Sequence, residues 1–133
     1  MRTLRGEDPL VVRQGKDAWE DQYRKGKWER LRDAQENTKW IAAYIVQREK
    51  GGKRSSVLDV GCGEGALLEC MRQSGSLVPY LGIDISETAI KKAQMLFPSE
   101  QFTPMDVELP QLKDQFDVIV FNEILYYVDA KKV

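Results

Sequence analysis

Histidine is absent from this chain of 133 residues, and cysteine occurs only at two positions. Without imidazole the commonest general base is missing, so any catalysis must proceed without it, and we expect no metal site. Cys62 and Cys70 are too few and too close together for a disulfide framework, which favours a reducing cytoplasm. No apolar stretch approaches the ~20 residues that span a bilayer, and the N-terminus lacks a secretory apolar region. These absences predict a soluble, cytoplasmic protein with no membrane partner.

Charge is distributed unevenly although the net charge is only −1. Residues 1–54 carry 14 Lys and Arg against 9 Asp and Glu, whereas residues 55–133 carry 6 against 12. A basic extension could favour a nucleic-acid substrate. Its charges, however, are interleaved with acids, as in Glu29-Arg30 and Arg32-Asp33, which is typical of a solvated helix face. We therefore divide the chain into an N-terminal helical cap or extension, 1–54, and a core, 55–133, and do not expect nucleic acid as a partner.

The core alternates apolar runs with amphipathic segments. The pattern predicts strands at 56–60, 79–83, 101–103 and 116–121, helices at 64–74 and 87–97, the latter capped by Ser86, and a weak turn or short helix at 108–113. Such alternation indicates right-handed βαβ crossovers and an α/β fold with a doubly wound, Rossmann-like parallel sheet. Ligands of such sheets bind beyond the carboxyl ends of the strands.

Three helical segments are expected before the core. Apolar spacing predicts helices near 17–25 and 27–35, interrupted at Gly26. A further helix is capped by Thr38 and ended by Gly51-Gly52. Its apolar face, which we expect to pack on the sheet, consists of Trp40, Ile41, Tyr44 and Ile45.

A glycine-rich turn follows the first strand of the core. The strand 56–60 leads into Gly61-Cys62-Gly63, where glycine permits positive φ and leaves room for a ligand beside the backbone N–H groups. Asp59 lies on the strand just before, where an unpaired buried carboxylate would cost several kcal/mol. We expect it to hold a polar group, and we interpret the turn as a nucleotide-binding site.

Four segments in this order resemble class I S-adenosylmethionine-dependent methyltransferases. Residues 57–65 resemble the first motif, an apolar strand, an acid and Gly-x-Gly-x-Gly; residues 80–86 resemble the second strand, 102–107 the third motif, and 116–123 the fourth strand with its active-site end. The resemblance implies a sheet in the order 3-2-1-4-5-7-6. This chain ends soon after the fourth strand, so we expect the order 3-2-1-4 with the remaining strands absent.

The resemblance also implies roles for the residues that hold the methyl donor. Asp84, about twenty residues after the glycines, would take both ribose hydroxyls, and Ile85 would lie against the adenine. Asp106 and Val107 would recognise the adenine edge. Gly61, Cys62 and Gly63 would approach the methionine part of the donor, and Asp59 would order its ammonium group.

The methyl acceptor is expected beyond the fourth strand and under an N-terminal cap. Asn122 would lie beside the donor or the acceptor, Glu123 could accept a proton from an amine or hydroxyl, and Tyr127 could line the pocket as a second candidate catalytic residue. Tyr23, within an aromatic stretch that resembles the cap of small-molecule members, could fold over the donor. The function implied is transfer of a methyl group from S-adenosylmethionine to nitrogen or oxygen of a small molecule, leaving S-adenosylhomocysteine.

Other interpretations remain open on the sequence alone. Gly61-x-Gly63-x-x-Ala66 also satisfies the fingerprint of NAD-type oxidoreductases, although these have no use for Asp59 or Asp106. A non-catalytic nucleotide-binding fragment is another alternative, and an RNA or tRNA methyltransferase is an alternative for the substrate. Because strand 116–121 would leave an open edge, the chain is either a fragment of doubtful activity alone or, if complete, a homodimer through that edge.

Overall fold

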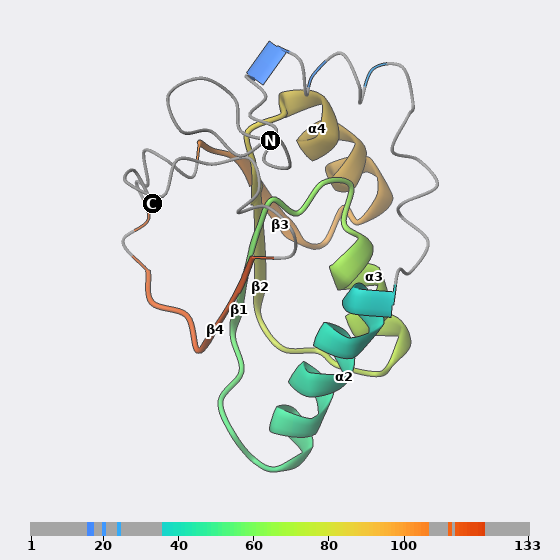
Figure 1. Ribbon diagram of the computed structural model, residues 1–133, viewed down its shortest axis with the longest axis vertical. Coiled ribbons are helices and arrows are strands. Elements are labelled where there is room, and N and C mark those ends of the chain that lie inside the picture. The colour runs from blue at the N-terminus through green and yellow to red at the C-terminus, as the bar shows by residue number, and fades with distance from the viewer. Residues whose placement is uncertain are drawn as a thin grey trace, which may run out of the picture.

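Four parallel strands form one sheet in the order β3-β2-β1-β4 in the computed structural model (Figure 1), which describes residues 16, 17, 20, 24, 36–106, 112 and 114–121. The strands are β1 (Val57–Val60), β2 (Tyr80–Asp84), β3 (Gln101–Pro104) and β4 (Val118–Phe121). The strand order expected from the sequence is confirmed. Each strand lies within two residues of its expected bounds.

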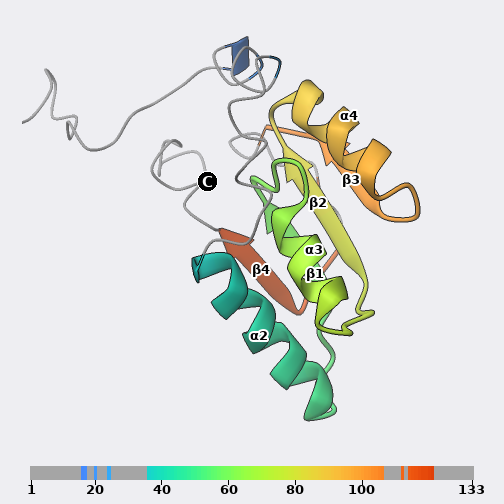
Figure 2. The same ribbon diagram turned by 90° about the vertical axis from the view of Figure 1, so that its right-hand side faces the viewer.

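Three helices cover one face of this sheet: α2 (Glu36–Lys50), α3 (Ala66–Gln73) and α4 (Glu87–Leu96). Figures 1 and 2 show all three on the same side. The Ser86 hydroxyl accepts a hydrogen bond from the Ala89 N–H at 3.1 Å, so the predicted cap of α4 is confirmed. Helices α3 and α4 connect β1 to β2 and β2 to β3 on this face of the sheet. Because the strands are parallel, their carboxyl ends lie at the same edge of the sheet.

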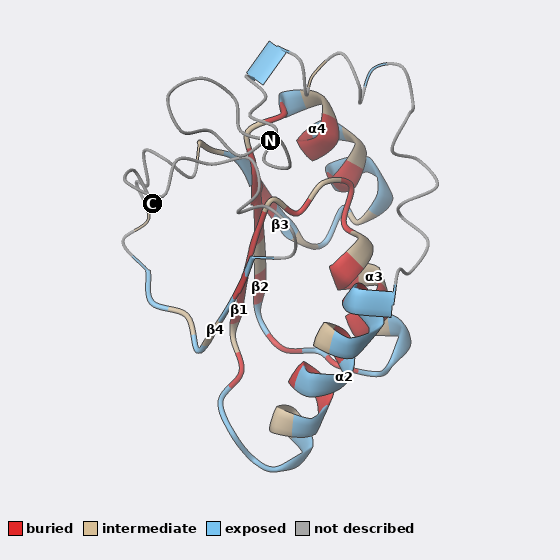
Figure 3. Cartoon of the chain, in the orientation of Figure 1, coloured by how far each residue is buried: buried red, intermediate tan, exposed pale blue. Residues whose placement is uncertain are grey.

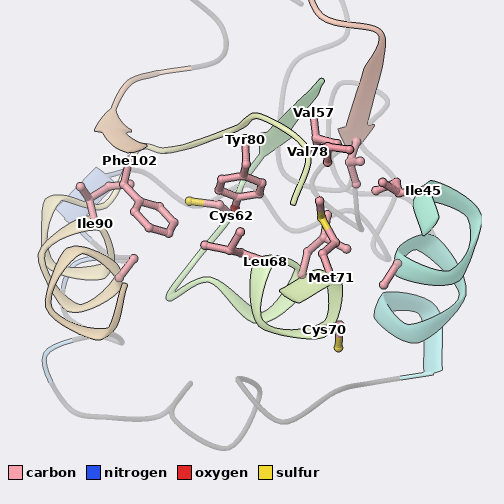
Figure 4. Close-up of a cluster of buried hydrophobic side chains, with 14 residues drawn as sticks. Ile45, Val57, Cys62, Leu68, Cys70, Met71, Val78, Tyr80, Ile90 and Phe102 are labelled. Atoms are coloured by element: carbon pink, nitrogen blue, oxygen red, sulfur yellow. The ribbon is translucent and has the colours of Figure 1, made fainter. Parts of the chain in front are cut away.

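The main hydrophobic core lies between the sheet and these helices (Figures 3 and 4). Alternate side chains of each strand point into it, among them Val57, Tyr80, Phe102 and Val120. The opposite face of the sheet carries a smaller cluster formed by Leu58, Val60 and Ile83, against which Leu81, Met105, Leu112 and Phe116 pack. Both faces of β1 are buried, as expected for the interior of a parallel sheet.

Helix α2 differs in part from its predicted packing face: Ile45 is buried and Ile41 packs against the core as expected, but Trp40 and Tyr44 do not. Its buried residues are Thr38, Ala42, Ile45 and Val46, whereas Trp40 is 74% exposed and Tyr44 57%. Thr38 lies within the helix, so its prediction as the N-cap is also wrong. Helix α3 packs against α2, and the residues that α2 buries include the small Ala42, whereas the predicted face followed the bulkiest side chains.

Several expected elements lie outside the described residues. These are most of the helices predicted at 17–25 and 27–35, and most of the segment 108–113. Within the described ranges no helix has the length and hydropathy needed to cross a membrane.

Candidate functional site

The glycine-rich turn is hydrogen-bonded to the end of β2. The N–H groups of Gly61 and Cys62 both donate to the Ile83 carbonyl, at 2.8 and 3.0 Å. On the other side of β2, the Met105 N–H donates to the Asp84 carbonyl at 2.8 Å. The turn, the end of β2 and the residues after β3 thus form one continuous edge, which is where parallel sheets bind ligands.

Glycines with positive φ angles form the turn. Gly63 has φ +58° and Gly65 has φ +97° just before α3 begins at Ala66. A Cβ at Gly65 would lie 2.8 Å from the Phe97 ring, so this position is closed to larger residues by packing as well as by backbone angle. The turn therefore presents backbone rather than side chains to a ligand at the start of α3.

The Asp84 carboxylate connects the glycine-rich turn to the start of α4. Its two oxygens accept hydrogen bonds from the Gly63 N–H at 2.8 Å and the Ser86 N–H at 2.9 Å. Burial raises the pKa of Asp84, although these two N–H groups oppose that rise. A carboxylate offers about four acceptor positions, so Asp84 can hold the turn and still accept hydroxyl groups of a ligand.

Asp59 lies beneath the turn and is only 3% exposed. Its Oδ2 accepts a hydrogen bond from the Tyr80 hydroxyl at 2.7 Å. The pKa of Asp59 is raised to about 7, mainly by burial and to a smaller degree by the charge of Asp84, and the hydrogen bond from Tyr80 opposes this rise. Asp59 is thus a carboxylate whose charge at neutral pH depends on its immediate partners.

The remaining predicted residues of this edge differ in exposure. Cys62 is buried, and Figure 4 shows its side chain within the core cluster beside Tyr80. Burial raises the pKa of its thiol well above the ordinary value, so only its backbone is available to a ligand. Ile85 and Asp106 are partly exposed, directly after β2 and shortly after β3. The sheet therefore places them on either side of Asp84.

A segment from the N-terminal region contacts this edge at α4. The Glu20 carboxylate accepts hydrogen bonds from the backbone N–H of Thr88, at 2.9 and 3.2 Å to its two oxygens, and from the Thr88 hydroxyl. Lys16 forms an ion pair with Glu87 in the same helical turn. Glu87 and Thr88 lie three and four residues after Asp84, so these contacts bring residues 16 and 20 to the start of α4.

Five predicted site residues lie outside the described residues: Tyr23, Val107, Asn122, Glu123 and Tyr127. The structure brings together Asp59, Gly61, Gly63, Asp84 and their neighbours, and their roles toward a ligand stay predictions. Across the described residues, no group of three or more potential metal ligands is found.

Sequence reasoning missed Tyr80 and Gly82 as partners of Asp59, and Glu20 and Thr88 as a contact between distant segments. The sequence held a signal for the first pair. Tyr80 and Gly82 are two residues apart, so they lie on the same side of a strand that is expected to pair with the strand of Asp59. The second carried none, because a single acid far from its partner has no periodicity to detect.

Chemically, this edge offers carboxylates at the ends of neighbouring strands and an open backbone turn at a helix start. Such a set suits a nucleoside with hydroxyl and ammonium groups, because carboxylates accept several hydrogen bonds from such donors.

Comparison with known proteins identifies the family. A family described as "Methyltransferase domain" matches residues 28–132. Among curated proteins, the malonyl-[acyl-carrier protein] O-methyltransferase of Hamiltonella defensa subsp. Acyrthosiphon pisum is 35% identical over 96 residues, covering 71% of this chain and 36% of that protein. The ubiquinone biosynthesis O-methyltransferase of Thiobacillus denitrificans is 42% identical over 79 residues, covering 54% of this chain and 33% of its own length. This chain thus spans about a third of the length of these relatives.

Solved structures show the same fold. Magnesium protoporphyrin IX methyltransferase of Synechocystis PCC 6803, crystallised with bound SAM, superposes with a TM-score of 0.61 at 22% identity, covering 92% of this chain and 68% of that one. The plantazolicin methyltransferase BpumL, in complex with SAH and a desmethyl analogue, gives a TM-score of 0.52 at 27% identity over 77% of this chain and 38% of its own. With the family match, the sheet order and the glycine-rich turn, the chain belongs to the class I S-adenosylmethionine-dependent methyltransferase family.

Proposed function

We propose that this chain binds S-adenosylmethionine at the carboxyl ends of β1, β2 and β3 and forms the donor-binding part of a small-molecule methyltransferase. The observation that carries this proposal is the Asp84 carboxylate, which holds the Gly63 N–H at 2.8 Å and so ties the donor turn to the ribose position. The solved relatives with bound SAM or SAH support the choice of ligand.

Each residue of the edge has one task in this proposal. Asp84 accepts the ribose hydroxyls, Ile85 lies against the adenine, and Asp106 with Val107 recognises the adenine edge. Gly61, Cys62 and Gly63 present their backbone to the methionine part. Asp59 supplies negative charge beneath the donor's ammonium group.

The bound donor supplies a sulfonium methyl group that is open to in-line displacement. Because alignment and exclusion of water can provide most of the rate, a strong base is not required. Asn122 and Glu123 would align the acceptor, Glu123 or Tyr127 would receive its proton, and Tyr23 would close over the donor. The O-methyltransferase names of the curated relatives favour oxygen over nitrogen as the accepting atom.

The proposal also includes a cellular location and an oligomeric state. A cytoplasmic location is supported by Cys62 and Cys70, which are both free and buried. If the chain is complete, we expect a homodimer through β4, which is supported by the position of β4 at the edge of the described sheet.

Calorimetry with S-adenosylhomocysteine and NAD tests the proposal. We expect the first ligand to bind and NAD not to bind. Asp84→Ala should weaken binding at least tenfold, about 1.4 kcal/mol or more. Asp117→Ala is the matched control, because Asp117 also accepts a backbone N–H, from Ser56 at 2.9 Å, but at the opposite end of the sheet. Binding of NAD instead, or unchanged affinity in Asp84→Ala, would contradict the proposal.

A further inference from the structure

The buried carboxylate of Asp59 sits at a position where its charge is expensive. It lies on the central strand β1, paired on one side with Gly82 of β2 and on the other with Val120 of β4. An isolated ionised carboxylate in such a site is strongly disfavoured. Whatever keeps it charged therefore controls how much negative potential reaches the turn two residues later.

Tyr80 can hydrogen-bond to Asp59 because residue 82 of β2, a glycine, has no side chain. Tyr80 and Gly82 point to the same side of the strand, and the Tyr80 side chain crosses over Gly82 to reach Asp59. A Cβ on Gly82 would lie 2.8 Å from the Tyr80 hydroxyl oxygen, and equally close to Cys62 Sγ and Phe102 Cδ1. The absence of a side chain at residue 82 is thus what admits the hydroxyl.

The surroundings leave the Tyr80 hydroxyl as a neutral donor. Burial raises the pKa of Tyr80 well above its ordinary value, so the hydroxyl keeps its proton. The charge of Asp84 on β2 disfavours the charged form of Asp59, and Cys62 of the turn is a buried neutral thiol. Glu100 also acts on Tyr80, and it is paired with Arg72 at 2.7 Å. Of the groups that act on Asp59, the Tyr80 hydrogen bond is the one that favours its ionised form.

We propose that Tyr80 is a positioning residue of the donor site, whose hydroxyl holds the Asp59 carboxylate beneath the turn that receives the donor's ammonium group and favours its charged form. The inference rests on the proposed function. Tyr80 does not touch the donor; it acts through Asp59, and Gly82 is the space that makes the contact geometrically available.

The sign of the pH effect follows from this arrangement. The donor's ammonium group favours ionised Asp59, so affinity should fall as the pH drops through about 7, the pKa of Asp59. Removing the Tyr80 hydroxyl removes the contact that lowers this pKa, so the fall should begin at higher pH. The two proteins should therefore differ most below neutral pH and converge under alkaline conditions.

Calorimetry with S-adenosylhomocysteine from pH 6 to 8.5 tests this on Tyr80→Phe, which keeps the ring and its edge-on contact with Phe102. We expect the midpoint of the affinity profile to rise by about one pH unit, with about fivefold weaker binding at pH 7 and about tenfold weaker binding at pH 6. Tyr44→Phe, which removes an exposed hydroxyl on α2, should match the wild type. Asp59→Asn should bind weakly and lose the pH dependence.

An unchanged profile in Tyr80→Phe, or equal weakening at every pH, would overturn the inference, because loss of packing alone has no pH midpoint. If Tyr80→Phe does not fold, proton exchange during binding to the wild type decides. Titrations in buffers of different ionisation enthalpy should show proton release near pH 7, and its absence would overturn the inference. A wild type that binds no S-adenosylhomocysteine at any pH would instead refute the proposed function.

Discussion

At the residue scale, we predict that the buried carboxylate of Asp59 lowers the free energy of unfolding when it is ionised, although its charge strengthens binding of the donor. Its pKa in the folded state, about 7, is above the ordinary value of 3.8 mainly because of burial. Its stabilising contribution is therefore complete below pH 3.8 and lost as the pH rises through about 7. Asp59→Asn should raise the free energy of unfolding at pH 8 by on the order of 1–4 kcal/mol, measured by urea denaturation, with little gain near pH 4.

The control for this prediction is Asp117→Asn. Hydrogen bonds from Ser56 lower the pKa of Asp117, so removing its charge should not stabilise the protein above pH 4. A less stable Asp59→Asn at pH 8 would show that its charge is favourable in the fold, contrary to this account.

Gly65 is predicted to be required by its contact as well as by its backbone angle. Gly65→Ala should destabilise by about 2–4 kcal/mol, combining left-handed strain with displacement of Phe97. Gly75→Ala isolates the two effects, because Gly75 has φ +87° but a Cβ there would meet no atom within 4 Å. It should cost only about 1–2 kcal/mol. Equal losses in thermal or urea unfolding would assign the whole effect to backbone angle.

The sequence located most of this edge but not its internal contacts. Asp59, the glycines and Asp84 could be placed at strand ends because apolar runs and glycines mark those ends directly. That Asp84 would accept the Gly63 N–H, or that Tyr80 would reach Asp59, depends on side-chain directions across neighbouring strands. Alternation along β2 indicates that Tyr80 and Gly82 share one side of the strand, but it does not show that the Tyr80 hydroxyl reaches Asp59 or that Asp84 turns toward Gly63, so these contacts required the structure.

At the element scale, the start of α4 is held by two acceptors, the side chains of Ser86 and Glu20. The Ser86 hydroxyl accepts from the Ala89 N–H, and Glu20 accepts from Thr88. Burial raises the pKa of Glu20, but hydrogen bonds from Ser86 and Thr88 and the charge of Lys16 outweigh it and lower the pKa to about 2. Its contribution to stability is thus present above its ordinary pKa of 4.5 and lost as the pH falls toward 2.

Glu20→Gln should therefore destabilise the protein at pH 7 by about 1 kcal/mol. The loss should shrink between pH 4.5 and 2, because the wild-type acid gains its proton over that range. Glu36→Gln, at an exposed acid in the first turn of α2, serves as the control and should change little. If both variants behave alike in pH-dependent thermal unfolding, the contact between Glu20 and α4 contributes nothing specific.

Helix α2 shows where periodicity is insufficient. Its existence and its end near Gly51-Gly52 could be predicted, yet the buried face is set by Ala42, Ile45 and Val46 rather than by Trp40 and Tyr44. Large side chains can project from a helix whose small residues permit close approach of its neighbour, here α3. Bulk alone was therefore a poor guide to the packing face.

At the scale of the whole molecule, the side of the sheet away from α2, α3 and α4 is unevenly covered. Ile119 and Phe121 pair with Leu58 and Val60 and so lie on that side of the edge strand β4, with Ile119 53% exposed. Unpaired strand edges beside apolar groups favour association. The exposed apolar group on β4 supports the homodimer proposed above.

Sedimentation velocity on the 133-residue chain tests that dimer. We expect a dimer for the wild type and a monomer for Ile119→Lys, because a charged residue on an edge strand opposes pairing. Leu77→Lys replaces an exposed leucine between α3 and β2, away from β4, and should stay dimeric. A monomeric wild type would contradict the dimer and leave the donor site unaffected.

The central claim is that the donor occupies the carboxyl edge of β1, β2 and β3, and an amide NMR titration with S-adenosylhomocysteine tests it most directly. We predict the largest shifts at Gly61, Gly63, Asp84, Ile85 and Asp106, little change at Ala42 and Gly52, and no response to NAD. Shifts confined to other parts of the chain, or a response at this edge to NAD alone, would contradict the account.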